Sequence, residues 1–288
     1  RQIAETTESP LRVLAGPGTG KTFALMRRVH RILHEGQDPS RVLLCTFTRT
    51  AALDLQRELM GLGVEGAELV RAGTVHSLCF SMLSAADVLP LTGRVPRPLL
   101  RFEERFLLED LRGTNGEGLR DLGRRLTAFS AAWARLQSET PGWPQDAADR
   151  AFLGLLESWL GFHQAMLVGE LVPLALRFLR DNPLSPHRPR FDHVLVDEFQ
   201  DLNRAEQVLL DELASNGSLS VIGDEDQSIY SFKHAHPDGI ARFDEEHPGT
   251  HDESLDECRR CPAVVVAMAN ALIANNQTRS DRELRASP

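Results

Sequence analysis

Ala15-Gly16-Pro17-Gly18-Thr19-Gly20-Lys21-Thr22 is the stretch that decides the fold. It follows the apolar run Leu11–Ala15, which is typical of a strand, and it opens the run Thr22–His34, whose apolar residues recur at helical spacing. Glycines in such a turn let backbone N–H groups converge on phosphate oxygens, and the helix N-terminus adds a positive dipole end. The stretch is interpreted as a phosphate-binding loop, with alanine where the pattern usually has glycine, and we expect all eight residues to contact a nucleotide.

Two residues of this loop and two residues at a later strand end supply the chemistry that ATP hydrolysis needs. Lys21 would reach the β and γ phosphates as a compact charge, and the Thr22 hydroxyl would ligate Mg²⁺. Asp197 and Glu198 follow the apolar run 194–196. Asp197 suits a second Mg²⁺ ligand, and Glu198 is placed to orient and polarise the attacking water. The sequence therefore predicts ATP and Mg²⁺ as cofactors.

Strand-like and helical patterns alternate on both sides of a long helical block. After the first strand and helix, residues 41–47 and 68–72 are predicted to be strands, and each is followed by a helical pattern. Strand character returns at 193–197 and 219–223. The alternation predicts an α/β fold with a parallel sheet, interrupted by an all-helical insertion.

Composition restricts the class of protein. The 42% hydrophobic and 25% charged residues are ordinary for a globular chain, no apolar run approaches the length that spans a bilayer, and no signal-peptide pattern is visible. The four cysteines form no disulfide-scaffold pattern, so a reducing, cytoplasmic setting is expected. A net charge of −9 argues against wrapping of duplex DNA, but it permits single-strand binding by aromatic stacking in a locally positive groove.

At this point the sequence resembles the UvrD/Rep-type superfamily 1 DNA helicases. The matching segments run in order: Thr46–Ala52 resembles motif Ia, Gly73–Ser77 motif Ib, Asp197–Asp201 motif II, Gly223–Phe232 motif III, and Leu255–Cys261 stands where motif IV should be. The resemblance implies a RecA-like P-loop NTPase sheet with an inserted helical subdomain. It divides the chain into 1–89 (domain 1A, first part), 90–188 (inserted helical subdomain 1B), 189–249 (domain 1A, second part) and 250–288 (truncated start of the second RecA-like domain, 2A).

The same resemblance implies roles for individual residues. Gln227 would sense the γ-phosphate, and Arg260 aligns with the motif IV arginine that reaches it. Single-stranded DNA contacts are implied for seven residues, namely Phe47, Arg49, Thr74, His76, Tyr230, Phe232 and Lys233. Core packing for Phe47 and Phe232, a structural hydrogen bond for Tyr230 and a core position for His76 stay open as alternatives.

The adenine site departs from the family pattern. The family commonly holds adenine between an arginine after Gly-Lys-Thr and the motif IV tyrosine, and those positions are Phe23 and Arg259 here. We hypothesise that the aromatic and guanidinium faces have exchanged sides, with a core position for Phe23 as the alternative. Gln2 is a weak match to the glutamine that reads adenine in the family. The Cys-x-x-Cys at Cys258 and Cys261 has no further ligands nearby in sequence, and no structural metal is expected.

The expected function is an ATP-dependent DNA helicase or translocase, 3′ to 5′ by resemblance, acting in DNA repair as a DNA-dependent ATPase. Its expected partners are single-stranded DNA and the rest of the second motor domain, with no membrane. Motifs V and VI of the family do not occur in this chain, so weak activity is expected of the isolated 288 residues. A non-motor ATP-dependent DNA-binding adaptor and the motor subunit of a helicase–nuclease are the alternatives.

Overall fold

The computed structural model describes residues 2–85, 88–95, 97–230, 234–276 and 282–287. The strands are β1 (Leu11–Ala15), β2 (Val42–Thr46), β3 (Arg71–Thr74), β4 (His193–Val196), β5 (Ser218–Gly223), β6 (His251–Leu255), β7 (Glu257–Cys258) and β8 (Arg285–Ala286). The α-helices are α1 (Gln2–Glu5), α2 (Lys21–His34), α3 (Arg49–Gly61), α4 (Val75–Leu83), α5 (Leu89–Thr92), α6 (Arg101–Asn115), α7 (Leu119–Ala134), α8 (Ala147–Phe162), α9 (Leu171–Asp181), α10 (Arg204–Ala214), α11 (Asp238–Ala241), α12 (Phe243–Glu246) and α13 (Ala263–Ile273). The 3₁₀ turns are η1 (Pro39–Arg41), η2 (Ala67–Leu69), η3 (Gln137–Glu139), η4 (Val168–Glu170), η5 (Phe199–Asp201) and η6 (Glu225–Gln227).

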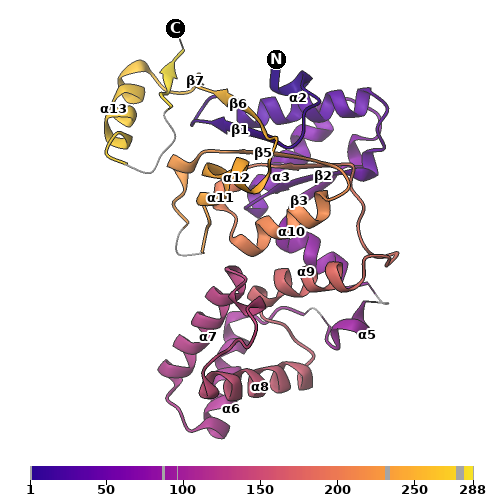
Figure 1. The fold of residues 1–288 in the computed structure, drawn as a ribbon, viewed down its shortest axis with the longest axis vertical. Coiled ribbons are helices and arrows are strands. Elements are labelled where there is room, and N and C mark those ends of the chain that lie inside the picture. The colour runs from indigo at the N-terminus through magenta and orange to yellow at the C-terminus, as the bar shows by residue number, and fades with distance from the viewer. Residues whose placement is uncertain (1, 86–87, 96, 231–233, 277–281, 288) are drawn as a thin grey trace. The chain divides into compact units, whose positions relative to one another are not determined.

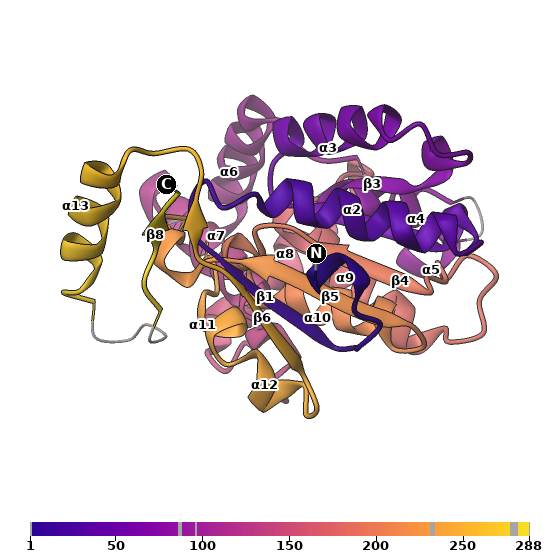
Figure 2. The same cartoon turned by 90° about the horizontal axis from the view of Figure 1, so that it is seen from above.

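A six-stranded sheet organises the part of the chain that carries the phosphate-binding loop. Its strand order is β3-β2-β4-β5-β1-β6, and every neighbouring pair is parallel. Helices α2 and α3 cover one face of the sheet, and α11 and α12 lie on the other face (Figures 1 and 2). The predicted α/β class is confirmed. Because all six strands run the same way, the segments after β1, β4 and β5 meet at one edge of the sheet.

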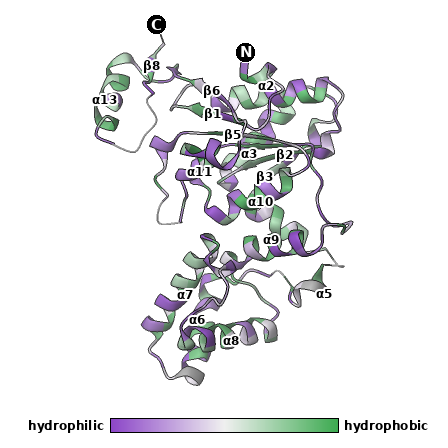
Figure 3. Cartoon of the chain, in the orientation of Figure 1, coloured by the Kyte–Doolittle hydropathy of each residue, from purple (hydrophilic) through white to green (hydrophobic). Residues whose placement is uncertain are grey.

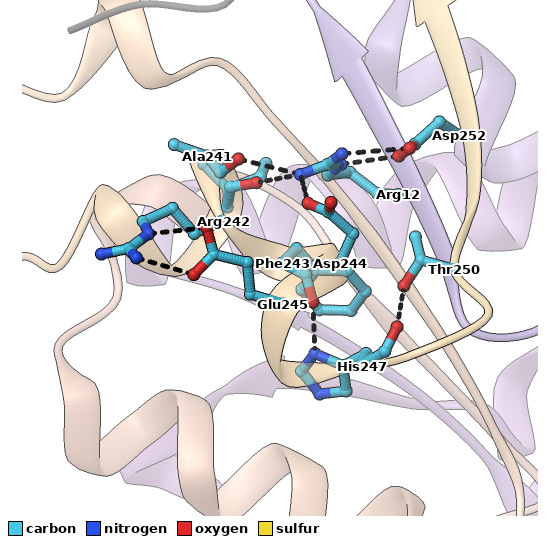
Figure 4. A network of polar contacts seen from close by, with 10 residues as sticks. Arg12, Ala241, Arg242, Phe243, Asp244, Glu245, His247, Thr250 and Asp252 are labelled. Carbon is cyan, nitrogen blue, oxygen red and sulfur yellow. Dashed lines mark hydrogen bonds and ion pairs between the residues drawn. The ribbon is translucent and has the colours of Figure 1, made fainter.

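Successive side chains of β1 point to opposite faces of the sheet and contact different elements there. Leu11, Val13 and Ala15 are buried in the core cluster shared with the apolar face of α2. Arg12 points to the opposite face, where its guanidinium donates to the carbonyl oxygens of Ile240 (3.1 Å) and Ala241 (2.9 Å) and binds two aspartates (Figure 4). The central strands carry the apolar colouring that a sheet buried on both faces requires (Figure 3).

The chain divides into two compact units. The first comprises residues 1–75, 190–202 and 210–288, and the second comprises residues 76–189 and 203–209. The second unit has its own core between α6, α7 and α8, which includes Leu107, Phe129 and Phe152. The subdomain boundaries at 89/90 and 188/189 remain predictions. None of the helices that the structure describes combines the length and apolar character that crossing a bilayer requires.

One element differs from the sequence-based prediction. The strand predicted at residues 68–72 begins at Arg71, because Gly66 takes a left-handed backbone (φ 83°) and starts the η2 turn first. Pairing of β3 with β2 then sets the register, from Leu43↔Arg71 to Thr46↔Thr74. β6 pairs with β1 at the edge of the same sheet, and the domain boundary at residue 250 remains a prediction.

Candidate functional site

The loop after β1 has the close backbone geometry that its glycines allow. Gly18 and Gly20 take left-handed conformations, with φ of 71° and 92°, and Gly20 caps α2. The Thr19 hydroxyl donates to the Gly16 carbonyl oxygen at 2.8 Å and closes the loop on itself. A Cβ on Gly18 would lie 2.6 Å from the Arg260 Cβ, so no side chain fits there without displacing its neighbour.

Lys21 and Glu198 face each other across this site. The Lys21 Nζ lies 2.7 Å from the Glu198 Oε2, and 11% and 32% of the two side chains are exposed. The residues are brought together because β1 and β4 end at the same edge of the sheet. Glu198 takes a left-handed backbone (φ 52°) that turns the chain from β4 into η5. Such strain in a non-glycine residue costs on the order of 1–3 kcal/mol and is concentrated at functional sites.

Asp197 is the buried carboxylate of the site. Its backbone N–H continues the ladder to the Cys45 carbonyl oxygen at 2.8 Å, and its side chain accepts from the Glu198 N–H at 3.0 Å. Burial and then the Glu198 charge raise the pKa of Asp197 to about 6, although Lys21 and the Glu198 N–H act in the opposite direction. A buried carboxylate beside a second carboxylate is a site whose ionised form a divalent cation stabilises, so these residues fit Mg²⁺.

A chain of amide contacts leads away from Glu198. The Gln200 Nε2 donates to the Glu198 Oε2 at 3.0 Å, and the Gln200 Oε1 accepts from the Asp224 N–H at 3.0 Å. The Asp224 carboxylate accepts from the Gln227 Nε2 and from Arg282, each at 2.5 Å. Gln200, Asp224 and Arg282 were not among the predicted site residues. Gln200 and Asp224 lie inside motifs II and III, but only the folded sheet reveals their contacts.

The motif IV segment lies against the phosphate-binding loop. The Arg259 N–H donates to the Gly18 carbonyl oxygen at 2.9 Å, and the Gly16 N–H donates to the Leu255 carbonyl oxygen at 3.3 Å. Arg260 therefore lies beside Gly18, and its role at the γ-phosphate remains a prediction. Phe23 is 68% exposed at the start of α2, with the Arg27 guanidinium 5.8 Å from its ring centre, so the alternative of a core position for Phe23 is wrong.

The predicted DNA-binding residues lie in different surroundings. The rings of Phe47 and Tyr230 are in contact, with centroids 4.9 Å apart at 49°. Arg49 is exposed at the first turn of α3, whereas Thr74 is buried at the end of β3. His76 belongs to the second compact unit. Phe232 and Lys233 lie outside the described residues.

His76 and Gln2 complete the predicted set. The His76 Nδ1 lies 3.0 Å from the Glu206 Oε1, and 37% of the His76 side chain is exposed, so a core position for His76 is wrong. Gln2 is exposed in α1. The four cysteines are free thiols, and the buried Cys258 contacts the loop at Gly18.

The chain is similar to known proteins along almost its whole length. Residues 1–233 match the family AAA_19, described as AAA domain. The ATP-dependent DNA helicase UvrD1 of Mycobacterium tuberculosis is 30% identical over 321 residues, which cover 99% of this chain and 40% of that protein. The ATP-dependent DNA helicase PcrA of Staphylococcus aureus is 28% identical over 297 residues, covering 98% of this chain and 40% of that protein. The chain thus spans about two fifths of the length of these relatives.

Proposed function

The chain belongs to the AAA domain family, and from that membership we propose that it is the ATP-binding part of an ATP-dependent DNA helicase that moves along single-stranded DNA. The observation that carries the proposal is the pairing of Lys21 with Glu198 at the phosphate-binding loop. A cation that can bind phosphate and a carboxylate that can orient water, at one edge of the sheet, are two of the groups that phosphoryl transfer to water uses. The UvrD1 and PcrA relatives are named ATP-dependent DNA helicases, which supports DNA as the polymer along which the protein moves.

The residues at the loop have separate proposed roles in ATP hydrolysis. Backbone N–H groups of the loop and the Lys21 ammonium would hold the phosphates, and Glu198 would release Lys21 and orient the attacking water. Thr22 and Asp197 would hold Mg²⁺, which would neutralise phosphate charge during hydrolysis. Among the described residues no group of three or more His, Cys, Asp or Glu side chains could hold a metal ion. Few protein ligands suit Mg²⁺, which proteins commonly hold through one or two carboxylates together with substrate phosphates.

Nucleotide state would reach the DNA through the residues that follow β5. Gln227 would exchange its bond with Asp224 for the γ-phosphate, and Arg260 would reach the same phosphate from the motif IV segment. Phe47 and Tyr230 would separate to stack on bases, which is worth about 1–3 kcal/mol per base. Arg49, Thr74, His76, Phe232 and Lys233 complete the proposed DNA contacts. The direction of movement, 3′ to 5′, rests on the resemblance alone.

The adenine base would lie between Phe23 and Arg259. Both side chains are exposed beside the loop, one on α2 and one on the motif IV segment. An aromatic ring and a guanidinium can each stack on a base. Gln2 is retained as the weaker candidate for reading the adenine edge. The four free thiols support the cytoplasmic setting that we propose for the protein.

ATP hydrolysis by the longest natural form of the protein, with and without single-stranded DNA, tests the proposal. We expect Lys21→Ala to lose nucleotide affinity, because the phosphates lose their cation. We expect Glu198→Gln to keep nucleotide affinity while hydrolysis falls about 10²–10⁴-fold, since the carboxamide cannot accept a proton from water. Glu109→Gln, which removes a carboxylate paired with Arg105 on α6, is the matched control and should hydrolyse ATP normally.

The alternatives predict different results in the same experiment. An adaptor would bind ATP without stimulation of its hydrolysis by DNA. A wild-type protein that ignores millimolar Mg-ATP would refute the nucleotide site itself. A nuclease partner domain changes neither result, so the motor part of a helicase–nuclease behaves as the helicase does.

A further inference from the structure

Gln200 is a buried polar side chain that lies between Glu198 and Asp224. It is 1% exposed, and both ends of its carboxamide are bonded, the Nε2 to the Glu198 carboxylate and the Oε1 to the Asp224 N–H. The two bonds fix the orientation of the amide, because exchange of its oxygen and nitrogen would place donor against donor at Asp224. The side chain therefore connects the end of β4 to the end of β5 through a rigid, fully bonded group.

The glycine that opens motif III makes room for this contact. A methyl group on Gly223 would overlap the Gln200 Oε1 and would lie 2.7 Å from the Ile240 Cδ1. The carboxamide oxygen thus lies against the backbone of β5, at a position where only glycine leaves room for it. Two motifs that are separate in the sequence are joined here by one side chain and the space left for it.

The Glu198 carboxylate that Gln200 binds is also the ion-pair partner of Lys21. The Glu198 Oε2 is shared by the Lys21 Nζ at 2.7 Å and the Gln200 Nε2 at 3.0 Å. When Lys21 turns to a phosphate, the bond from Gln200 still holds the carboxylate. At the other end, Asp224 accepts from Gln227, three residues before Tyr230, which contacts Phe47. The same amide therefore touches the water-activating group and the base of the loop that carries the proposed DNA contacts.

We propose that Gln200 is a positioning residue that holds Glu198 for water attack and couples it to the loop after β5, so that DNA binding sets the rate of hydrolysis. This inference rests on the proposed function. Gln200 touches neither phosphate nor water in this arrangement, and it acts through Glu198 and Asp224. Its loss should therefore affect turnover and DNA stimulation, and it should leave nucleotide binding, which depends on the loop and Lys21, intact.

Gln200→Leu tests the proposal in the longest natural form of the protein. We expect the KM for ATP and the affinity for a fluorescent ATP analogue to stay within about threefold of wild type. We expect kcat to fall about 10- to 100-fold, the value of a hydrogen bond to a charged group, and DNA stimulation to be lost. Gln207→Leu, which removes an equally buried glutamine (1% exposed) from α10, is the control for loss of a buried amide and should keep its DNA stimulation.

Gly223→Ala provides a second, independent variant. It keeps the amide but displaces it, so it should reproduce the loss of kcat and of DNA stimulation. The double variant should then be no slower than Gln200→Leu alone, because both changes act through one contact. Thermal unfolding of each variant separates this pattern from failure to fold.

Three results overturn the inference: unchanged kcat and DNA stimulation in Gln200→Leu, a loss confined to ATP affinity, or effects of the two substitutions that multiply. Failure of the proposed function is recognised separately, because the wild-type protein itself would then show no DNA-stimulated hydrolysis.

Discussion

Gly18 and Gly36 have the same left-handed backbone but different neighbours. Their φ values are 71° and 81°, yet a Cβ on Gly18 meets Arg260 and Cys258, whereas a Cβ on Gly36 meets nothing within 4 Å. Substitutions at these two glycines therefore distinguish the energetic cost of a left-handed backbone from the cost of the steric contact at Gly18. At the nucleotide loop we expect the contact to decide function.

Gly18→Ala should weaken ATP binding by at least tenfold, while Gly36→Ala should leave it unchanged. Both substitutions place a side chain in the left-handed region, which costs about 1–2 kcal/mol of stability. Only the first also pushes the motif IV segment away from the loop. Titration with a fluorescent ATP analogue measures the difference, and equal affinities in the two variants would contradict the assignment of Gly18 to the nucleotide site.

The residues of the loop could be assigned from the sequence because their chemistry is local. Lys21 and Thr22 follow a glycine-rich turn, and Asp197 and Glu198 follow an apolar strand. Gln200 could not be assigned in this way, since its second partner lies 24 residues further along the chain on another strand. Arg282 pairs with Asp224, 58 residues away in the sequence, and no local sequence pattern predicts this contact.

At the scale of elements, α12 is held to the rest of its unit by a histidine just after its end. The His247 ring stacks on Phe243 with centroids 4.0 Å apart, and its nitrogens lie 3.0 Å from the Phe243 carbonyl oxygen and 3.0 Å from the Asp211 Oδ1 (Figure 4 shows the Phe243 contact). Burial lowers the pKa of His247, but the Asp211 hydrogen bond and charge, the Phe243 carbonyl and the Glu246 charge outweigh it and raise the pKa. The protonated ring therefore stabilises the fold.

His247→Gln should lower the melting temperature by a few degrees at pH 6 and by less at pH 9. A raised pKa in the folded state contributes stability that is fully present below the unfolded value near 6.5, and this stability is lost as the pH rises through the folded pKa. His34→Gln, at an exposed position at the end of α2, is the control. A loss of the same size at both pH values would show that the charge of His247 plays no part.

Elements with strong periodicity were predicted well, and one short strand was not. The bounds of β1 are confirmed, since an apolar run and the glycine-rich turn after it specify them. The start of β3 was predicted three residues too early, because the apolar residues near Leu69 belong to a 3₁₀ turn, which periodicity cannot distinguish from a strand. Pairing with β2, not local sequence, determines where β3 begins.

At the scale of the whole molecule, the residues of the proposed nucleotide site lie at the edge of one sheet. The phosphate loop, Glu198 and the motif IV segment all belong to one compact unit, and the relatives are longer than this chain. In a two-domain motor, movement follows from closure of two walls around the nucleotide. The UvrD/Rep-type resemblance is confirmed by these relatives, while the direction of movement remains a proposal.

The isolated 288-residue chain should bind Mg-ATP but separate DNA strands weakly or not at all. The reason is that one domain can hold a nucleotide, whereas movement requires two domains that close around it. Unwinding of a fluorescently labelled partial duplex, measured on a preparation whose nucleotide binding has been verified, checks this expectation. Robust strand separation by this chain alone would falsify it.

Lys21 and Glu198 neutralise each other in the folded chain. Removing a cation from water without a counter-charge is expensive, and here a carboxylate occupies the place that phosphate oxygens would take. In the proposed cycle, the triphosphate would replace the carboxylate as the counter-charge of Lys21, and release of the product would restore the ion pair. Neither step would leave Lys21 with an uncompensated charge.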